Sequence, residues 1–372
     1  MSSYQDAVSR VIDDIVRPGA DEVDAAAAFP RKAITALGEA GILGMTVGQS
    51  AGGGGAGLAE AADVVRQLSA ACGSTAMVVM MHYAATVVIE NHGPQDVRQA
   101  IGAGEHLTTL AFSEAGSRSH FWAPMSTASQ SADQVRLDAE KSWITSAGEA
   151  DSYVWSSRPV ADDGPMTLWL VPADTSRLSQ PGSFDGLGLR GNRSAPIEAA
   201  GATVPASAML GDDGAGLDVA LAEVLPWFLI MSAAFSVGLM EAVTAETGAH
   251  LTSTRLEHLD QSLAEQPMVR ADHARMRVAT DQAAALLADT LAAVGGGRED
   301  AMLRVLEVKA AAGEAATAVT DLAMKVCGGA AFRKELAIER HFRDARAARV
   351  MAPTTDALLD FVGRAINGLP LL

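Results

Sequence analysis

Two helix-patterned regions flank a middle region of short strand-patterned segments, and this order constrains the fold more than any other feature. Up to about residue 105, apolar residues recur at intervals of three and four, with a break at Gly73. From about 106 to 215 the segments are short, rich in β-branched and aromatic residues, and separated by glycine, proline and aspartate. From Gly216 long helical patterns return. We therefore expect an N-terminal helical domain at 1–105, antiparallel strands in a small barrel or sandwich at 106–215, and a C-terminal four-helix bundle at 216–372.

The composition is that of an acidic, mainly helical protein. Hydrophobic residues make up 49% of the 372 residues and aromatic residues only 5%, so alanine, leucine, valine and methionine must supply the core. Acidic residues outnumber basic ones by 45 to 28, which argues against a nucleic-acid partner. Cys72 and Cys327 form neither a metal-binding set nor a disulfide framework, so we expect no metal and a reducing, cytoplasmic setting.

The N-terminal segment and the apolar helices give no sign of export or membrane insertion. The first residues, MSSYQDAVSRVIDDIV, lack the basic segment followed by an apolar run that marks a signal peptide. No stretch of about 18 or more apolar residues is free of charge, so no membrane partner is expected.

The glycine-rich segment 48–57, GQSAGGGGAG, is either a loop or a cradle for phosphate groups. A phosphate cradle would need a following Lys-Ser/Thr pair and a preceding strand, and the sequence has neither. We therefore expect a loop.

The segment RVMAPTTDALLDF, residues 349–361, contains a well-marked helix start. Pro353 suits a first helical turn, Thr354 and Thr355 can cap free backbone N–H groups, and Asp356 offsets the positive end of the helix. The residues before it, Met351 and Ala352, cannot accept a proton. The corner is therefore expected to be structurally defined and chemically inert.

Three spaced motifs resemble those of the acyl-CoA dehydrogenase family. In the middle region, TLAFSEAGSRSH (109–120) is followed by KSWITSA (141–147), matching the family's Ser-Glu and Trp-Ile-Thr segments. Near the C-terminus, KVCGGAAFRKELAIERHFRDAR (325–346) follows the family's Gly-Gly and Arg-Asp-Ala pattern. The N-terminal segment GILGMTVGQSAGGGGAGLAEAADVVRQLSA is similar as well, so the resemblance covers essentially the whole chain.

The resemblance implies a homodimer or homotetramer that holds FAD between the β domain and the helical bundle. Part of the dinucleotide would contact a neighbouring subunit. By position, the residues that would line the flavin and its ribityl arm are Phe112, Ser113, Ser119, Trp143 and Thr145. The residues that would approach the ADP part are Arg255, Gln266, Lys325, Gly328 and Gly329, and Thr354 would cap its helix near the cofactor. Each has an ordinary alternative: Trp143 as barrel core, Arg255 as a solvated charge, and the two glycines as a helix stop.

The sequence departs from the family at the catalytic base. Most members place a glutamate six residues after Arg-Asp-Ala, where it takes a proton from the carbon next to the thioester carbonyl. The matching position here is Ala352. Other members place the base on the first bundle helix, where this chain has Trp227, Phe228 or Leu229. The expected substrate pocket, lined by Trp227, Phe228, Met351 and Ala352, therefore lacks a base, and the catalytic residue is unknown.

Four side chains are weak candidates for the missing base or for another proton-transfer role. Glu223 precedes Trp227 by about one helical turn, and its alternative is a surface or capping role. Asp356 is more consistent with capping or solvation. His82 and His120 could donate a proton or neighbour the flavin, or His82 could be a core histidine whose ring nitrogens are satisfied.

These features leave three functions open. The first is a specialised FAD enzyme, either a flavin-dependent monooxygenase (hydroxylase) with a dry pocket or an enzyme that modifies thioesters in a non-standard way. The second is an acyl-CoA or acyl-carrier-protein dehydrogenase with Glu223 or a histidine as base. The third, a scaffold without FAD, is disfavoured by the retained flavin motif. The expected partners are a small-molecule or acyl-thioester substrate and a flavin reductase or electron-transfer protein.

Overall fold

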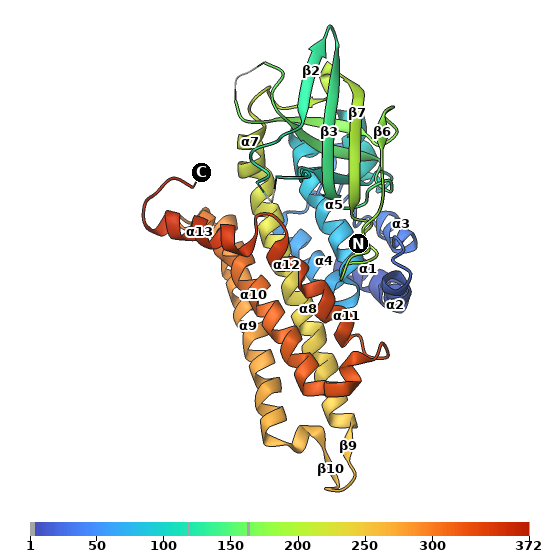
Figure 1. Ribbon diagram of the computed structural model, residues 1–372, viewed down its shortest axis with the longest axis vertical. Coiled ribbons are helices and arrows are strands. Elements are labelled where there is room, and N and C mark those ends of the chain that lie inside the picture. Colours follow the sequence, from blue (N-terminus) through green and yellow to red (C-terminus); the bar gives the residue numbers. More distant parts are fainter. Residues whose placement is uncertain (1–3, 118–119, 162–163, 372) are drawn as a thin grey trace. The chain divides into compact units, whose positions relative to one another are not determined.

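The computed structural model describes residues 4–117, 120–161 and 164–371, which form two compact units (Figure 1). Unit 1 comprises the described residues of Met1–Val64, Met77–Gly186 and Arg190–Phe228. Unit 2 comprises Val65–Ala76, Leu187–Leu189 and the described residues of Leu229–Leu372. The three domain bounds expected from the sequence stay a prediction.

The N-terminal part of the chain is helical, as predicted. A π-helical turn, η1 (Ile12–Val16), joins α1 to α2 in one continuous helical run and lies just before Pro18, which lacks the N–H for the normal helical bond. The predicted break at Gly73 is confirmed, because α4 ends at Ala71 and α5 begins at Gly73. The helices are α1 (Tyr4–Val11), α2 (Arg17–Ala25), α3 (Arg31–Glu39), α4 (Leu58–Ala71), α5 (Gly73–His92) and α6 (Gln95–Gly102).

The glycine-rich segment is a folded loop around the short 3₁₀ helix η2 (Gln49–Ala51). Its backbone N–H groups are bonded within the chain: Gly53 donates to Gly48, Gly54 to Gly44, and Gly55 to Val47. A β-carbon at Gly53 would lie only 2.2 Å from the Val47 carbonyl oxygen. The glycines therefore serve close backbone packing, and the loop interpretation is confirmed.

Two four-stranded sheets form the β region of unit 1, with the orders β1-β4-β5-β8 and β2-β3-β7-β6. Every residue of β4 is buried, and so are the first five of β5, so these strands lack the alternation of a sheet with one solvated face. The strands are β1 (Thr108–Ala111), β2 (Thr127–Ser131), β3 (Gln134–Ile144), β4 (Ser152–Ser157), β5 (Thr167–Pro172), β6 (Leu178–Ser179), β7 (Ala195–Pro205) and β8 (Met209–Leu210), and the 3₁₀ helix η3 spans Ala206–Ala208.

One pair of strands differs from the antiparallel expectation. β1 and β4 run parallel, with Thr108 opposite Ser152 and Ala111 opposite Trp155. The chain between them passes through β2 and β3 of the other sheet, which supplies the long connection that parallel strands need. The prediction of antiparallel strands is therefore wrong for this pair.

A single helical run from Gly216 to Ser253 leads into the C-terminal bundle. It consists of α7 (Gly216–Val219), the π-helical segment η4 (Ala220–Val224) and α8 (Leu225–Ser253). Pro226 lacks an N–H for the normal helical bond, and the π segment lies directly before it. The predicted long apolar helix is confirmed.

Unit 2 is built on long helices packed side by side, with α10 against α9 and α13 (Figure 1). A small hairpin of two short strands joins α8 to α9. The elements are β9 (Arg255–Leu256), β10 (Gln261–Ser262), η5 (Leu263–Glu265), α9 (Pro267–Gly295), α10 (Ala301–Cys327), η6 (Gly328–Phe332), α11 (Ile338–Ala345), α12 (Ala347–Val350) and α13 (Thr355–Ile366).

Two helical segments are long and apolar enough to cross a membrane by length and composition, Gly73–His92 and Gly216–Ser253. Their most apolar windows are 83% and 61% buried inside the protein. Buried core helices of globular proteins have the same composition, so these segments are weak indicators of a membrane location.

Candidate functional site

A β-bulge in unit 1 presents Trp143 to solvent. The pairing of β3 with β7 shifts between Lys141 and Ile144, and Trp143 within this bulge has a φ of 58°, a left-handed conformation that is uncommon for a bulky residue. Its side chain is 61% exposed. The alternative of a barrel-core tryptophan is therefore wrong, and an aromatic surface is available at this position.

The bulge is joined to the segment that follows β1. Ser142 donates its backbone N–H to the Ser113 carbonyl at 3.0 Å, and Ala115 donates to Glu140 at the same distance. Phe112 is buried and Ser113 is half-buried. Thr145 is also buried, with its hydroxyl 3.4 Å from that of Ser194. The structure therefore brings together the predicted flavin-side segments, while Ser119 lies outside the described residues.

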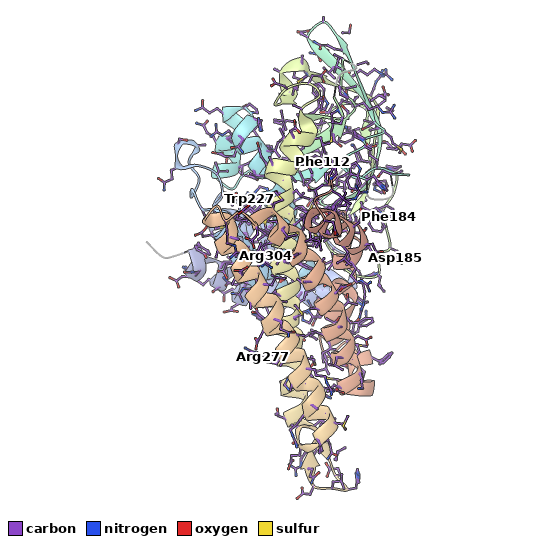
Figure 2. The ribbon with its side chains drawn as sticks, turned by 90° about the vertical axis from the view of Figure 1, so that its left-hand side faces the viewer. Phe112, Phe184, Asp185, Trp227, Arg277 and Arg304 are labelled. Atoms are coloured by element: carbon purple, nitrogen blue, oxygen red, sulfur yellow. The ribbon has the colours of Figure 1, made fainter. Side chains whose placement is uncertain are left out.

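Phe184 stacks on Trp143 and extends its aromatic surface. The two rings lie 4.2 Å apart between centroids, at an angle of 29°. Phe184 belongs to the segment after β6, next to Asp185 (Figure 2). The stacking gives a flat apolar face that a planar ring system can pack against.

A buried ion pair fixes the backbone on either side of this aromatic face. Lys141 donates to Glu114 Oε1 at 2.7 Å, to the Ser156 carbonyl at 2.7 Å and to the Ser156 hydroxyl at 3.0 Å. The Glu114 carboxylate also accepts from the Ser126 hydroxyl and from the backbone N–H groups of Met125 and Ser126. Every donor of the ammonium group thus has an acceptor, which a buried charge requires.

Both charges of the pair persist at neutral pH. Burial lowers the pKa of Lys141 to about 8, although Glu114 opposes this effect. Burial by itself would raise the pKa of Glu114, but the charge and hydrogen bond of Lys141 outweigh burial and hold that pKa below its ordinary value. Glu114 follows Ser113 directly and Lys141 precedes Trp143 by two residues, so the pair fixes both segments.

The residues expected near the ADP part of a dinucleotide lie in unit 2 and are paired with acidic or polar neighbours. Arg255 is exposed and donates to the Asp260 carbonyl at 2.9 Å and to its carboxylate. Lys325 contacts the largely buried Asp272 carboxylate at 2.8 Å. Gln266 donates to the Gln261 side chain at 2.9 Å. Arg255 and Lys325 are exposed and Gln266 is half-buried, so the two charged side chains are available to a ligand that exchanges their present partners for its own.

The two glycines after α10 fit a dinucleotide that approaches their backbone. Gly328 has a φ of 55° and a ψ of −136°, a conformation that only glycine adopts readily. A β-carbon at Gly329 would meet nothing within 4 Å, so no packing inside the described chain requires glycine there. The free space against this backbone and the exposed Trp143 face are both features that FAD binding needs.

The corner before α13, residues 351–353, carries no ionisable side chain. Thr354 is the N-cap of α13, and its hydroxyl accepts the Ala357 N–H at 3.3 Å. Pro353 lies before the cap and outside the helix, which corrects its expected place in the first turn. The Ala352–Pro353 peptide bond is cis. The carbonyl groups of Met351 and Pro353 accept hydrogen bonds from Lys309 of α10.

The weak candidates for the missing base are held by other groups. His82 is fully buried: Thr108 donates to its Nδ1, and its Nε2 lies 3.0 Å from the Leu43 carbonyl. Burial lowers the pKa of His82 to about 4, so it is a neutral core histidine at physiological pH. Glu223 is 2.8 Å from His92 Nε2 and accepts from Asn91 at 3.0 Å, so both of its oxygens are engaged.

His120 and Asp356 are solvent-exposed. His120 Nδ1 lies 2.9 Å from the Ser117 carbonyl, and its ring packs edge-on against Trp122. Asp356 lies in the first turn of α13, where an acidic residue complements the helix dipole. A general base needs shelter from water to gain basicity, which neither position provides.

The expected substrate-pocket residues are divided between the two units. Trp227 is half-buried and Phe228 buried in unit 1, whereas Met351 and Ala352 are half-buried in unit 2. A pocket shared by these four residues stays a prediction.

The sequence analysis missed two buried lysines, Lys141 and Lys309, that hold the backbone at these sites. Only Lys309 left a signal, since a lone lysine within an apolar stretch of helix is uncommon unless it has a buried partner, whereas Lys141 lies between the polar residues Glu140 and Ser142. Lys309 lies between Val308 and Ala310, which are both buried. Its partner could not be identified from the sequence.

Comparison with known proteins identifies all three regions. The acyl-CoA dehydrogenase N-terminal, middle and C-terminal domains match residues 2–103, 109–201 and 214–367. The mitochondrial short-chain specific acyl-CoA dehydrogenase of Homo sapiens is 27% identical over 347 residues, covering 91% of this chain and 83% of that protein.

Solved structures agree in fold. Butyryl-CoA dehydrogenase from Megasphaera elsdenii superposes with a TM-score of 0.90 at 20% identity over 99% of both chains. The prolyl acyl carrier protein oxidase AnaB superposes with a TM-score of 0.89 at 18% identity, covering 98% of this chain and 99% of that one. The predicted order of helical, β and helical regions is confirmed.

Proposed function

Because the chain belongs to the acyl-CoA dehydrogenase family, whose members use FAD, we propose that it is a flavin-dependent oxidoreductase that modifies an acyl thioester. In this proposal, the side chain of residue 352 does not accept a proton from the substrate. The observation that carries this proposal is the corner before α13. Ala352 offers a methyl group. Within the described residues, Lys309 is the ionisable side chain that donates hydrogen bonds to this corner. All of its donors are directed at backbone carbonyl groups.

The chain's own residues have distinct roles in this proposal. Trp143 and Phe184 would provide an apolar wall for the flavin ring, and Thr145 would offer it a hydroxyl group. The Glu114–Lys141 pair keeps the two flavin-side segments in register. Arg255, Gln266, Lys325 and the glycines Gly328 and Gly329 would receive the ADP part. FAD, when bound, supplies the acceptor or donor of two electrons.

An acyl thioester is the substrate class that the relatives favour. The human relative is named for short-chain acyl-CoA, and the structural neighbour AnaB for a prolyl group on an acyl carrier protein. Either coenzyme A or a carrier protein can therefore serve as the handle. We also propose a cytoplasmic homodimer or homotetramer that exchanges electrons with a flavin reductase or an electron-transfer protein.

A monooxygenase is the second candidate function, and the inert corner favours it. Oxygen chemistry on reduced flavin needs a site that excludes water more than it needs a carboxylate. The lack of a charged or ionisable side chain at Met351, Ala352 and Pro353 supports this candidate.

Anaerobic mixing of the FAD-loaded protein with acyl-CoA and acyl-carrier-protein panels tests the proposal. We expect at least one thioester to shift the visible flavin spectrum on binding, while saturated acyl thioesters leave the flavin oxidised. Efficient bleaching would mean ordinary dehydrogenation with another base. No spectral response to any thioester, together with an oxygenated product after chemical reduction and exposure to air, would favour the monooxygenase.

A further inference from the structure

Lys309 lies under the corner between α12 and α13 with almost no exposed surface. It is 1% exposed and belongs to the first half of α10. Its Nζ donates to the carbonyl oxygens of Pro353 at 2.7 Å, Met351 at 2.9 Å and Ala348 at 3.3 Å. An ammonium group has three donors, so one short stretch of backbone uses all of them.

The three acceptors are carbonyl groups that a helix cannot satisfy by itself. Ala348 lies in the last turn of α12, Met351 is its C-cap, and Pro353 comes before the N-cap of α13. Carbonyl groups at the end of a helix have no helical N–H partner and favour a positive charge nearby. Lys309 thus provides the donors that the break between two helices leaves missing.

Among the described residues, no carboxylate is bonded to Lys309, whose hydrogen bonds go to backbone carbonyl groups. Burial lowers its pKa to about 7. Arg349 at the end of α12 and Asp356 in the first turn of α13 are exposed. The ammonium group is therefore held by the corner's carbonyl groups alone.

A buried charge that depends on three carbonyl groups constrains them in return. If any of the three moves away, the ammonium group loses a hydrogen bond in a place that water does not reach. Residue 352 lies between two of the three acceptors, so its backbone can move little while Lys309 remains bonded.

We propose that Lys309 is a positioning residue whose ammonium group fixes the backbone of Met351–Pro353 and thereby the place at which residue 352 is presented. The backbone constraint stands by itself. The consequence for chemistry at residue 352 rests on the proposed function.

Hydrogen exchange of the full FAD-loaded chain at about pH 6, where Lys309 carries its charge, followed by mass spectrometry, tests the proposal without any substrate. In Lys309→Met, whose side chain has a similar length but no charge or donor, amides of residues 347–357 should exchange about tenfold faster, the effect of losing about 1.4 kcal/mol of local stability. Amides within α9 and the second half of α10 should keep their rates. Lys334→Met, at an exposed position outside the bundle helices, is the matched control and should change neither set.

Exchange in segment 347–357 that matches the parent would overturn the proposal, because the corner would then be fixed without Lys309. Uniform acceleration over all of unit 2 would also overturn it, since that result indicates a general packing role. If Lys309→Met does not fold, Lys309→Gln is measured in the same way, because its shorter neutral side chain cannot reach all three carbonyl groups. Neither outcome depends on catalytic activity. A failure of the Lys309 proposal can therefore be distinguished from a failure of the proposed function.

Discussion

Lys141 and Lys309 are buried to the same extent, 1% exposed each, but in different electrostatic surroundings. Lys141 in unit 1 has the Glu114 carboxylate at 2.7 Å, and burial lowers its pKa only to about 8. Lys309 in unit 2 has three carbonyl groups and no carboxylate, and its pKa falls to about 7. A carboxylate thus keeps a buried lysine charged, whereas carbonyl groups leave it close to neutralisation at physiological pH.

Lys141 and Lys309 also hold the backbone in different ways. The pair in unit 1 joins segments that are distant in sequence and balances its own charge. The single ammonium group in unit 2 ties one short corner and leaves its charge uncompensated. Removing a lysine from these two sites should therefore have different consequences.

The largest expected effect on stability is at Lys141. Lys141→Met leaves the Glu114 carboxylate buried without its partner and should lower the free energy of unfolding by about 3–5 kcal/mol, as measured by urea denaturation. Lys309→Met removes an unpaired charge and should cost much less. The double variant Lys141→Met/Glu114→Gln should recover part of the loss. Equal losses in the two single lysine variants would contradict the comparison.

The pH dependence of stability should distinguish the two lysines. Each has a folded pKa below its ordinary value of 10.5, so the unfolded chain keeps the proton longer and the free energy of unfolding rises with pH. The rise starts near pH 7 for Lys309 and near pH 8 for Lys141, with a limiting slope of about 1.4 kcal/mol per pH unit for each.

Urea denaturation at a series of pH values checks this expectation. The quantity compared is the free energy of unfolding of the parent and of each variant at each pH. Lys309→Met should remove the rise between pH 7 and pH 8, and Lys141→Met should preserve it. A rise that survives in Lys309→Met would mean that another group is responsible.

A smaller effect is expected at the helix cap beside the corner. Thr354→Ala removes the acceptor of the Ala357 N–H and should lower the free energy of unfolding by about 1 kcal/mol in thermal or urea denaturation. Thr354→Ser keeps the hydroxyl and should stay close to the parent. If Thr354→Ala lowered the free energy of unfolding as much as Lys141→Met, the cap rather than Lys309 would fix the backbone conformation of the corner.

Local patterns predicted the helices and their ends better than the pairing of distant segments. The break at Gly73, the long helical run from Gly216 and the cap at Thr354 follow from neighbours in sequence. The parallel pairing of β1 with β4 was missed, because strand periodicity does not encode the direction of the partner.

The buried lysines were missed for a related reason. Pro353 is 44 residues from Lys309, and Lys141 is 27 residues from Glu114, so no local pattern connects them. The interpretation of Ala352 as the position of a missing base comes only from comparison with the family motif and stays a prediction, since a single alanine carries no signal of its own. The exposure of Trp143 depends on a bulge that the sequence does not mark.

The central claim is that the corner is positioned for a base but lacks one, and Ala352→Glu tests it most directly. The FAD-loaded parent and variant are mixed anaerobically with saturated acyl-CoA, and the rate of flavin reduction is recorded, with Ala352→Gln as a control of the same shape. The account predicts that the parent and Ala352→Gln leave the flavin oxidised, while Ala352→Glu reduces it at least about 100-fold faster. Rapid flavin reduction by the parent, at the rate of Ala352→Glu, would contradict the account.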